Sequence, residues 1–351
     1  MFEDLQQHWP RATNPKPIVI FGAGSIVTDA HLPAYANAAY TVAGLYDPDL
    51  DKARAVAQMH GIEAFSSPEE AASHVDVVFD LATPPDAHAG ILSMLPQGSA
   101  VLIQKPMGSD LAGATRILKT CRERNLLAAV NFQLRFAPMM LALQDAVNKG
   151  LLGDIVDFDA WLALDTPWGL WKFLEPLPRV EISLHSIHYL DFIRALLGNP
   201  SGVHARSMGH PSSRIAQTRT AAILDYGDGI RCALSINHNH AFGRKHQACE
   251  FRICGTKGAA YLQLGVNLDY PKGEPDILEI NTGEGWQRVA LDGSWFPDAF
   301  TSRMSQLQRV AAGEETSLVS GVEDAWHTMA LVEAAYDSSA APATPIARKP
   351  Q

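Results

Sequence analysis

Two histidines and two carboxylates in one short segment have the spacing of a general acid–base site. Helical periodicity would put Glu181, His185 and His188 on one face, with Asp191 one turn further along. A carboxylate near an imidazole orients the ring and raises its basicity, as a general base requires. The histidines lack a Glu-x-x-His context, so we expect no metal here. The alternative is a buried helix whose histidines are hydrogen-bonded internally.

A lysine is the second candidate for chemistry. Lys105 lies between Gln104 and Pro106, directly after the apolar run 99–103. Proline disfavours helical backbone at the residue before it, so the lysine is expected in a loop at the end of a strand. Lysine–proline pairs also occur in solvated loops, and the sequence leaves both interpretations open.

These residues need a scaffold, and the N-terminal region has the pattern of a dinucleotide-binding one. The apolar run 18–21 leads into a glycine-rich turn and then a helix. Gly22 permits a tight turn, and Gly24 lets the backbone approach a phosphate. The helix would direct free N–H groups at the pyrophosphate. The third glycine of the fingerprint is replaced by Val27.

An acidic residue follows the next expected strand. The run 41–46 ends in Asp47, at about the 20-residue distance where a carboxylate can accept hydrogen bonds from the adenosine ribose. A carboxylate would repel the 2′-phosphate of NADP, so we expect NAD, with NADP possible because Lys52 and Arg54 lie nearby. Asp47 as a turn cap before Pro48 is the alternative.

The order of elements predicts an α/β protein with two domains. Apolar runs alternate with helical segments over residues 17–132, which indicates a doubly wound parallel Rossmann sheet in domain 1–135. Long alternating runs follow, with a hairpin turn at 225–229, so domain 136–351 is expected to be α+β with a largely antiparallel open sheet. Ligands of parallel sheets bind at the carboxyl ends of the strands.

The composition narrows the possible partners. A formal charge of −10 and a pI near 5.7 argue against nucleic acid and anionic membranes, and favour a small-molecule partner. The first residues carry acidic groups and no apolar stretch, so we expect no signal peptide and a cytoplasmic location. The cysteines have no metal or disulfide pattern and are expected to be buried thiols: Cys121, Cys232, Cys249 and Cys254.

Together, these motifs resemble the Gfo/Idh/MocA family of NAD(P)-dependent sugar and polyol dehydrogenases. The resemblance covers nearly the whole chain and depends on the order of individually modest motifs. These are the Gly22 turn with His31-Leu32-Pro33, the stretch 82–88, Gln104-Lys105-Pro106, the stretch 131–138, His188-Tyr-Leu-Asp191 ahead of Leu196-Leu197-Gly198, the stretch 253–258, and Glu323-Asp324-Ala325 with Glu333-Ala334-Ala335-Tyr336.

The resemblance implies that Lys105 and His188 act on a secondary alcohol bound over the nicotinamide. His188 is preferred to His185 because of its distance from Leu196-Leu197-Gly198. The implied cofactor-binding residues are Gly22, Gly24, Ser25, Ile26, Asp47, Thr83, Pro84, His88, Gln104, Lys105 and Gln133. The candidate substrate-binding residues are Arg135, Trp168, Trp171, Glu181, His185 and Asp191.

Two positions depart from the family pattern. Leu184 stands where the family usually has an acid, and Gln104 replaces the usual glutamate before the lysine. Glu181 and His185 are expected to supply the missing polar contacts, and we expect the substrate, or the direction of its binding, to differ from the common inositol and glucose types.

The resemblance leaves three activities open. A dehydrogenase acting on a sugar, polyol or sugar acid is the primary expectation. A redox-assisted glycosidase or lyase and a non-catalytic dinucleotide sensor are the alternatives. We expect a homodimer or homotetramer formed through the C-terminal sheet. Trp168 and Trp171 fit either a sugar-stacking loop or a subunit interface.

Overall fold

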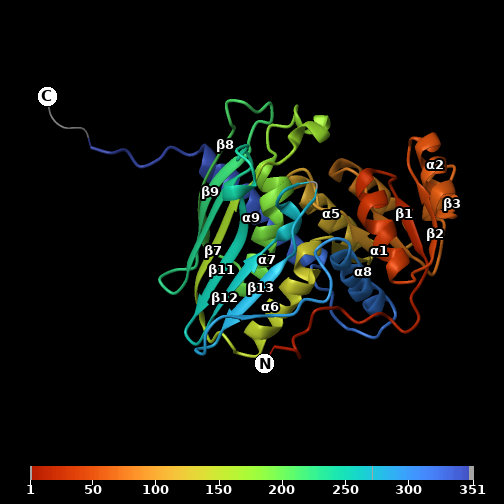
Figure 1. Cartoon of the computed structure of the whole chain (residues 1–351). Coiled ribbons are helices and arrows are strands. Elements are labelled where there is room, and N and C mark those ends of the chain that lie inside the picture. The colour runs from red at the N-terminus through yellow and green to blue at the C-terminus, as the bar shows by residue number, and fades with distance from the viewer. Residues whose placement is uncertain (1, 271, 348–351) are drawn as a thin grey trace.

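The computed structural model describes residues 2–270 and 272–347. Figure 1 shows two regions side by side, each built from a sheet and helices. Within the described residues, the N-terminal sheet has six parallel strands in the order β3-β2-β1-β4-β5-β6. Its strands are β1 (Ile18–Phe21), β2 (Val42–Tyr46), β3 (Glu63–Ala64), β4 (Val78–Leu81), β5 (Ala100–Ile103) and β6 (Leu127–Val130). The predicted Rossmann sheet is confirmed.

Helices cover both faces of this sheet, which explains why β1, β4 and β5 are buried at every position. The helices are η1, a π-helical turn (Val27–His31), α1 (Leu32–Asn37), α2 (Leu50–His60), α3 (Pro68–Ala72), η2 (Pro85–Ala87), α4 (His88–Met94) and α5 (Leu111–Glu123). The strand order reverses between β1 and β4, where a parallel sheet opens a crevice for a ligand. The sequence analysis did not predict β3 and α3, which are too short to give a periodic signal.

The C-terminal sheet has the order β14-β13-β12-β11-β7-β10-β9-β8 in the described residues. Its strands are β7 (Ile155–Ala163), β8 (Gly202–Met208), β9 (Arg219–Asp225), β10 (Arg231–Asn237), β11 (Ala248–Gly255), β12 (Ala259–Gln263), β13 (Ile277–Asn281) and β14 (Gln287–Arg288). Strands β7 and β10 pair in parallel and the other described neighbours are antiparallel. This confirms a largely antiparallel sheet and the hairpin between β9 and β10.

One face of the second sheet is covered and the other is open. Figure 1 shows helices between the sheet and the Rossmann region. These are α6 (Pro138–Asn148), α7 (Ile187–Leu197) and α9 (Val322–Ala340), while α8 (Asp298–Ala311) packs beside α1 and β5. On β7, Phe158 and Leu162 face the core, whereas Trp161 is 43% exposed on the outer face.

The cysteine expectation is correct for three residues and wrong for the fourth. Cys121, Cys232 and Cys249 are buried free thiols, but Cys254 is exposed. Side chains alternate along β11, so Cys254 shares the open face of the sheet with exposed Arg252.

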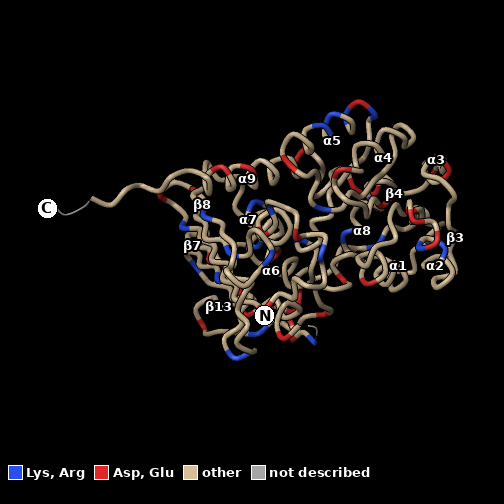
Figure 2. Tube along the Cα trace, turned by 90° about the horizontal axis from the view of Figure 1, so that it is seen from above, with Lys and Arg blue, Asp and Glu red and all other residues tan. Residues whose placement is uncertain are grey.

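Acidic and basic residues are distributed along the trace of both regions, as Figure 2 shows. In the described part of the chain, no helix is long and apolar enough to cross a membrane.

Candidate active site

The glycine-rich turn follows β1 and has the shape of a phosphate site. Gly22 has a φ of +112°, and a Cβ there would lie 2.4 Å from the carbonyl oxygen of Ala82. A Cβ on Gly24 would meet no heavy atom within 4 Å, so open space lies beside its backbone. Ser25 and Ile26 lead into η1, which begins at Val27. The Val27 side chain is fully buried. These features fit a bound pyrophosphate.

Asp47 lies directly beside this turn. Its Oδ2 accepts a hydrogen bond from the backbone N–H of Ala23 (2.8 Å), and its Oδ1 accepts one from Asp49 N–H (3.0 Å). Lys52 Nζ is 3.9 Å from Oδ2. Asp47 thus caps the turn, as the alternative interpretation expected, and it does so at the strand end where a ribose would bind.

The loops after β4 and β5 are joined by a histidine. His88 is fully buried, with Nε2 3.0 Å from the carbonyl oxygen of Thr83 and Nδ1 3.3 Å from that of Met107. Burial lowers its pKa. The ring is enclosed and both of its nitrogens face these two loops, so His88 holds them together, and its expected contact with the cofactor stays a prediction. Half-buried Thr83 and exposed Pro84 remain at the surface of this edge.

Lys105 reaches from the Rossmann sheet to the C-terminal domain. Its Nζ donates a hydrogen bond to the backbone carbonyl oxygen of Leu184 (2.9 Å). In the family that the sequence resembles, an acidic residue usually occupies the position of Leu184. Burial, with no compensating carboxylate, lowers the pKa of Lys105 to about 8. A main-chain carbonyl thus contacts the lysine at the position expected to bear a side-chain acid.

His188 lies at the start of α7 and near Lys105. Its ring packs edge-on against Phe132 and Trp295, at centroid distances of 6.4 and 6.2 Å. Nδ1 is buried and has no hydrogen-bond partner among the described residues. Burial, reinforced by the Lys105 cation, holds the pKa of His188 well below its ordinary value. The ring is therefore neutral at neutral pH. Trp295 was not identified from the sequence because an isolated loop tryptophan carries no motif.

His185 belongs to a second ring cluster. It lies 4.7 Å from His238 and 5.1 Å from Trp168, measured between ring centroids. Burial lowers the pKa of His185 well below its ordinary value, and the neighbouring His238, Lys105 and His188 add to the effect. Trp168 is 9% exposed, and its Nε1 has no partner among the described residues. His238 was missed, although a polar residue directly after a strand was a usable signal.

The expected grouping of Glu181 with His188 is wrong, although Glu181 and His185 both lie beside His238. Glu181 is fully buried and accepts hydrogen bonds from Ser186 Oγ (2.5 Å) and from the hydroxyl of Thr220. The segment Ile182–Ser186 forms a π-helical turn, η6, which changes the angular step between residues. Glu181 Oε1 lies 3.5 Å from His238 Nε2 without a hydrogen bond between them, and no hydrogen bond joins Glu181 to His188 among the described residues.

Asp191 and Arg135 also have partners other than the expected ones. Arg135 Nη2 donates to Asp191 Oδ1 (2.6 Å), and a second nitrogen pairs with Oδ2. Thr328 Oγ1 also donates to Asp191 (2.9 Å), and Asp324 pairs with Arg135 (2.9 Å). Both Asp191 and Arg135 are buried and fully engaged. This arrangement engages both side chains in a buried ion pair, and their expected role in substrate binding stays a prediction.

The remaining predicted residues lie at the edges of the site. Gln133 is buried in η3 (Gln133–Phe136), with Oε1 unpartnered among the described residues. Trp171 is half-buried and packs with Trp168 in a small apolar cluster. No group of three or more His, Cys, Asp or Glu residues in the described ranges is arranged to hold a metal ion.

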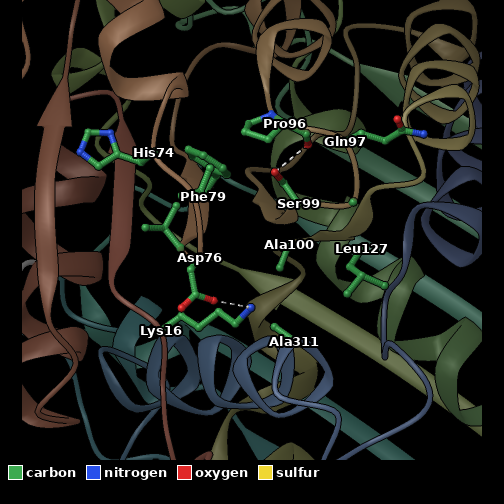
Figure 3. Close-up of a pocket in the computed structure, with 13 residues that line it drawn as sticks. Lys16, His74, Asp76, Phe79, Pro96, Gln97, Ser99, Ala100, Leu127 and Ala311 are labelled. Carbon is green, nitrogen blue, oxygen red and sulfur yellow. Dashed lines mark hydrogen bonds and ion pairs between the residues drawn. The ribbon is translucent and has the colours of Figure 1, made fainter.

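A cavity of about 300 Å³ lies away from this site (Figure 3). It is lined by the amino ends of β4, β5 and β6, and Lys16 pairs with Asp76 there at 3.0 Å. The glycine turn and Lys105 lie at the opposite, carboxyl ends of the strands. The cavity is therefore not part of the candidate active site.

Comparisons with known proteins match both regions. Residues 16–132 match the model described as an oxidoreductase family with an NAD-binding Rossmann fold, and residues 140–261 match the GFO/IDH/MocA C-terminal domain. D-apiose dehydrogenase of Rhizobium rhizogenes is 24% identical over 315 residues, covering 85% of this chain and 88% of that protein. Trans-1,2-dihydrobenzene-1,2-diol dehydrogenase of Bos taurus is 32% identical over 263 residues, 69% of this chain and 72% of that protein.

The fold is also present in solved structures. An oxidoreductase from Agrobacterium radiobacter, crystallised in complex with NAD+, L-tartaric acid and magnesium, has a TM-score of 0.78 to this chain. The two are 20% identical, and the alignment covers 93% of this chain and 97% of the other. At this identity the likeness demonstrates the common fold.

Proposed function

Because the chain belongs to the Gfo/Idh/MocA family of NAD(P)-dependent sugar and polyol oxidoreductases, we propose that Lys105 and His188 are its polar catalytic pair. The reaction moves hydride between a CH–OH group of a sugar, polyol or sugar acid and the nicotinamide. The main support is the hydrogen bond from Lys105 Nζ to the Leu184 carbonyl oxygen, at 2.9 Å. This contact joins the end of β5 to the segment that carries His185 and His188.

The two side chains suit different tasks. Neutral His188, with its unpartnered buried nitrogen, accepts the proton of the substrate hydroxyl. Lys105 is mostly cationic below about pH 8, and it donates a hydrogen bond to the oxygen as the carbonyl forms. A bound nicotinamide supplies the hydride acceptor. The protein contributes position and electrostatics.

Other groups would hold the cofactor and the substrate. Gly22, Gly24 and the start of the following helix would hold the pyrophosphate, and Asp47, which lies beside this turn, would bind the adenosine ribose. Trp168 and His185 offer ring faces and an unpartnered indole N–H beside the catalytic pair, which suits a hydroxylated substrate.

The test is reduction of NAD+ and NADP+, followed at 340 nm against a panel of sugars, polyols, aldonates and glycosides. Lys105→Ala is expected to lower turnover by about 100-fold or more. Lys119→Ala removes an exposed lysine on α5 and serves as the matched control. If the Lys105 and control variants turn over equally, the proposed role of Lys105 is wrong. NAD binding without turnover on any substrate would favour redox-assisted glycoside cleavage or a sensor.

Cofactor preference depends on Asp47 in this proposal. Asp47→Ala is expected to relax discrimination against NADP+ by about tenfold, equivalent to about 1.4 kcal/mol. The ratio of kcat/KM for NAD+ and NADP+ measures this effect. Asp51→Ala, which removes an exposed carboxylate on the same helix as Lys52, is the control. An unchanged ratio would assign cofactor choice to other residues.

We propose that a second copy of the chain covers the open face of the C-terminal sheet. Trp161 (43% exposed) and Ile223 (54% exposed) are outward-facing there. Ile223→Glu is expected to lower the mass measured by light scattering. Met59→Glu, at an exposed apolar position on α2, should leave the mass unchanged. A monomeric wild type would contradict the proposal.

A further inference from the structure

A buried chain of hydrogen bonds extends from the backbone of Lys105 into the Rossmann domain. Gln104 Oε1 lies 2.8 Å from the backbone nitrogen of Lys105, and Gln104 Nε2 lies 3.2 Å from His31 Nε2. The other ring nitrogen, Nδ1, is 2.6 Å from Asp80 Oδ2. His31 and Asp80 are fully buried, and Gln104 is 9% exposed. The chain thus connects η1, β4 and the loop after β5.

The direction of each hydrogen bond follows from the donor at one end. A backbone N–H can only donate, so the Gln104 atom facing Lys105 is the carbonyl oxygen and the amide nitrogen faces His31. The amide nitrogen also only donates, so His31 Nε2 accepts and carries no proton. The ring proton is then on Nδ1 and is donated to Asp80. The pattern therefore fixes the tautomer of His31, with the ring proton on Nδ1 facing Asp80 and none on Nε2.

Groups from each neighbouring element surround His31. Tyr35 Oη donates to Asp80 Oδ2 (2.6 Å), and burial raises the Tyr35 pKa well above its ordinary value, so this hydroxyl stays protonated. The polar and charged groups are Tyr35 of α1, Asp80 of β4, Gln104 after β5, Asn131 after β6 and, near Tyr35, Arg303 of α8. Asp80 is therefore the carboxylate that directly contacts the His31 ring.

We propose that Gln104, acting through His31 and Asp80, is a positioning residue that holds Lys105 in place for hydride transfer. This inference rests on the proposed catalytic role of Lys105. The amide at position 104 matters because it can donate to His31 while accepting from Lys105. The glutamate of the family pattern could accept from Lys105, but an ionised carboxylate cannot donate to His31. The amide therefore fixes the direction of each hydrogen bond in the chain without a titratable proton of its own.

The Gln104→Glu variant distinguishes an amide from a carboxylate at position 104. Its carboxylate and His31 Nε2 would be two acceptors facing each other, so His31 must take up a second proton to restore the contact. As the pH rises, His31 loses this proton, the two acceptors repel each other, and the Lys105 backbone loses its support. Wild-type protein has no such step.

The first measurement is the ¹⁵N NMR signal of the His31 ring in the protein without cofactor or substrate. At neutral pH, wild-type His31 is expected to carry its ring proton on Nδ1 and none on Nε2. In Gln104→Glu at low pH, Nε2 should carry a proton as well. A wild-type His31 that carries a proton on Nε2 at neutral pH would overturn the inference.

The second measurement is kinetic. Gln104→Leu is expected to lower kcat by about 100-fold while KM changes little, because the reacting groups are displaced. At low pH, the kcat of Gln104→Glu should lie between those of Gln104→Leu and the wild type. This kcat should fall as the pH rises. Gln97→Leu, which changes an exposed glutamine at the opposite edge of the sheet, is the control.

The outcomes distinguish this inference from the proposed function. If Lys105→Ala abolishes turnover but Gln104→Leu leaves kcat unchanged, the positioning role is wrong. A Gln104→Leu variant that is destabilised yet keeps wild-type kcat also overturns it. If Lys105→Ala turns over normally, the proposed function fails, and the NMR result still reports on the hydrogen-bond chain.

Discussion

Helix α7 carries two buried polar residues one turn apart whose surroundings are opposite. Asp191 accepts hydrogen bonds from Arg135 and Thr328, and it belongs to an ion-pair network that continues to Asp324. His188 Nδ1 is equally enclosed but has no partner among the described residues. Buried polar groups are normally hydrogen-bonded, so the pairing of Asp191 fits a structural role, and the unpartnered nitrogen of His188 fits the catalytic role that we propose for it.

The difference has an energetic meaning. A buried polar group without a partner costs about 1–3 kcal/mol of stability. An enclosed ion pair is different, because removing one partner leaves a buried charge unmatched. Replacing Asp191 should therefore lower the stability of the protein, whereas replacing His188 by an apolar residue should not.

The largest expected effect is on stability. Asp191→Ala leaves the buried Arg135 guanidinium with less compensation and is expected to destabilise the fold by about 3–5 kcal/mol. The midpoint of urea unfolding measures this change. Arg122→Ala breaks the exposed pair with Glu323 and should leave the midpoint unchanged. If both variants behave alike, the network around Asp191 does not stabilise the protein as proposed.

The next effect is on activity without loss of stability. His188→Leu removes the proposed base and an unpartnered polar ring together. Turnover is expected to fall by at least about 100-fold, while the unfolding midpoint stays the same or rises. His327→Leu, at an exposed position on α9, is the control for turnover. A large loss of stability in His188→Leu would place His188 with Asp191 as a structural residue.

The smallest effect is a pH dependence that sharpens the same contrast. Lys105, with a pKa of about 8, loses its proton as the pH rises, so oxidation should slow by about tenfold per pH unit above that value. His188 stays neutral far below its ordinary pKa, so the acidic limit should lie well below pH 6.5. Lys105→Arg should move the alkaline limit upward, because arginine keeps its charge. An unmoved limit would assign it to another group.

Local sequence patterns predicted the scaffold well. The runs that became β1, β4 and β5 are apolar at nearly every position because both faces of the sheet are covered. The glycine turn and Lys105 could be placed at one edge of the sheet, since carboxyl ends of parallel strands meet there. Short elements such as β3 escaped prediction because two residues carry no periodicity.

Helical spacing was a poorer guide to the site. It grouped Glu181 with His188, but the π-helical turn at Ile182–Ser186 shifts the faces, and Glu181 turns to Thr220 on β9 instead. Spacing also could not reveal that Asp191 has a buried arginine partner from η3. Similarly, the motif at His31 did not indicate its contacts with Asp80 and Gln104.

The sequence by itself determined the alternation of the longer strands and helices in the Rossmann region, the glycine turn and the chemical types available at the sheet edge. These depend on local backbone preference and on the periodicity of burial, which neighbouring residues express directly. Only the tertiary structure decided which polar groups are paired: Asp191 with Arg135, Lys105 with the Leu184 carbonyl, and His188 Nδ1 with no described partner. Pairing depends on side chains from distant elements, and a single sequence does not encode those distances locally.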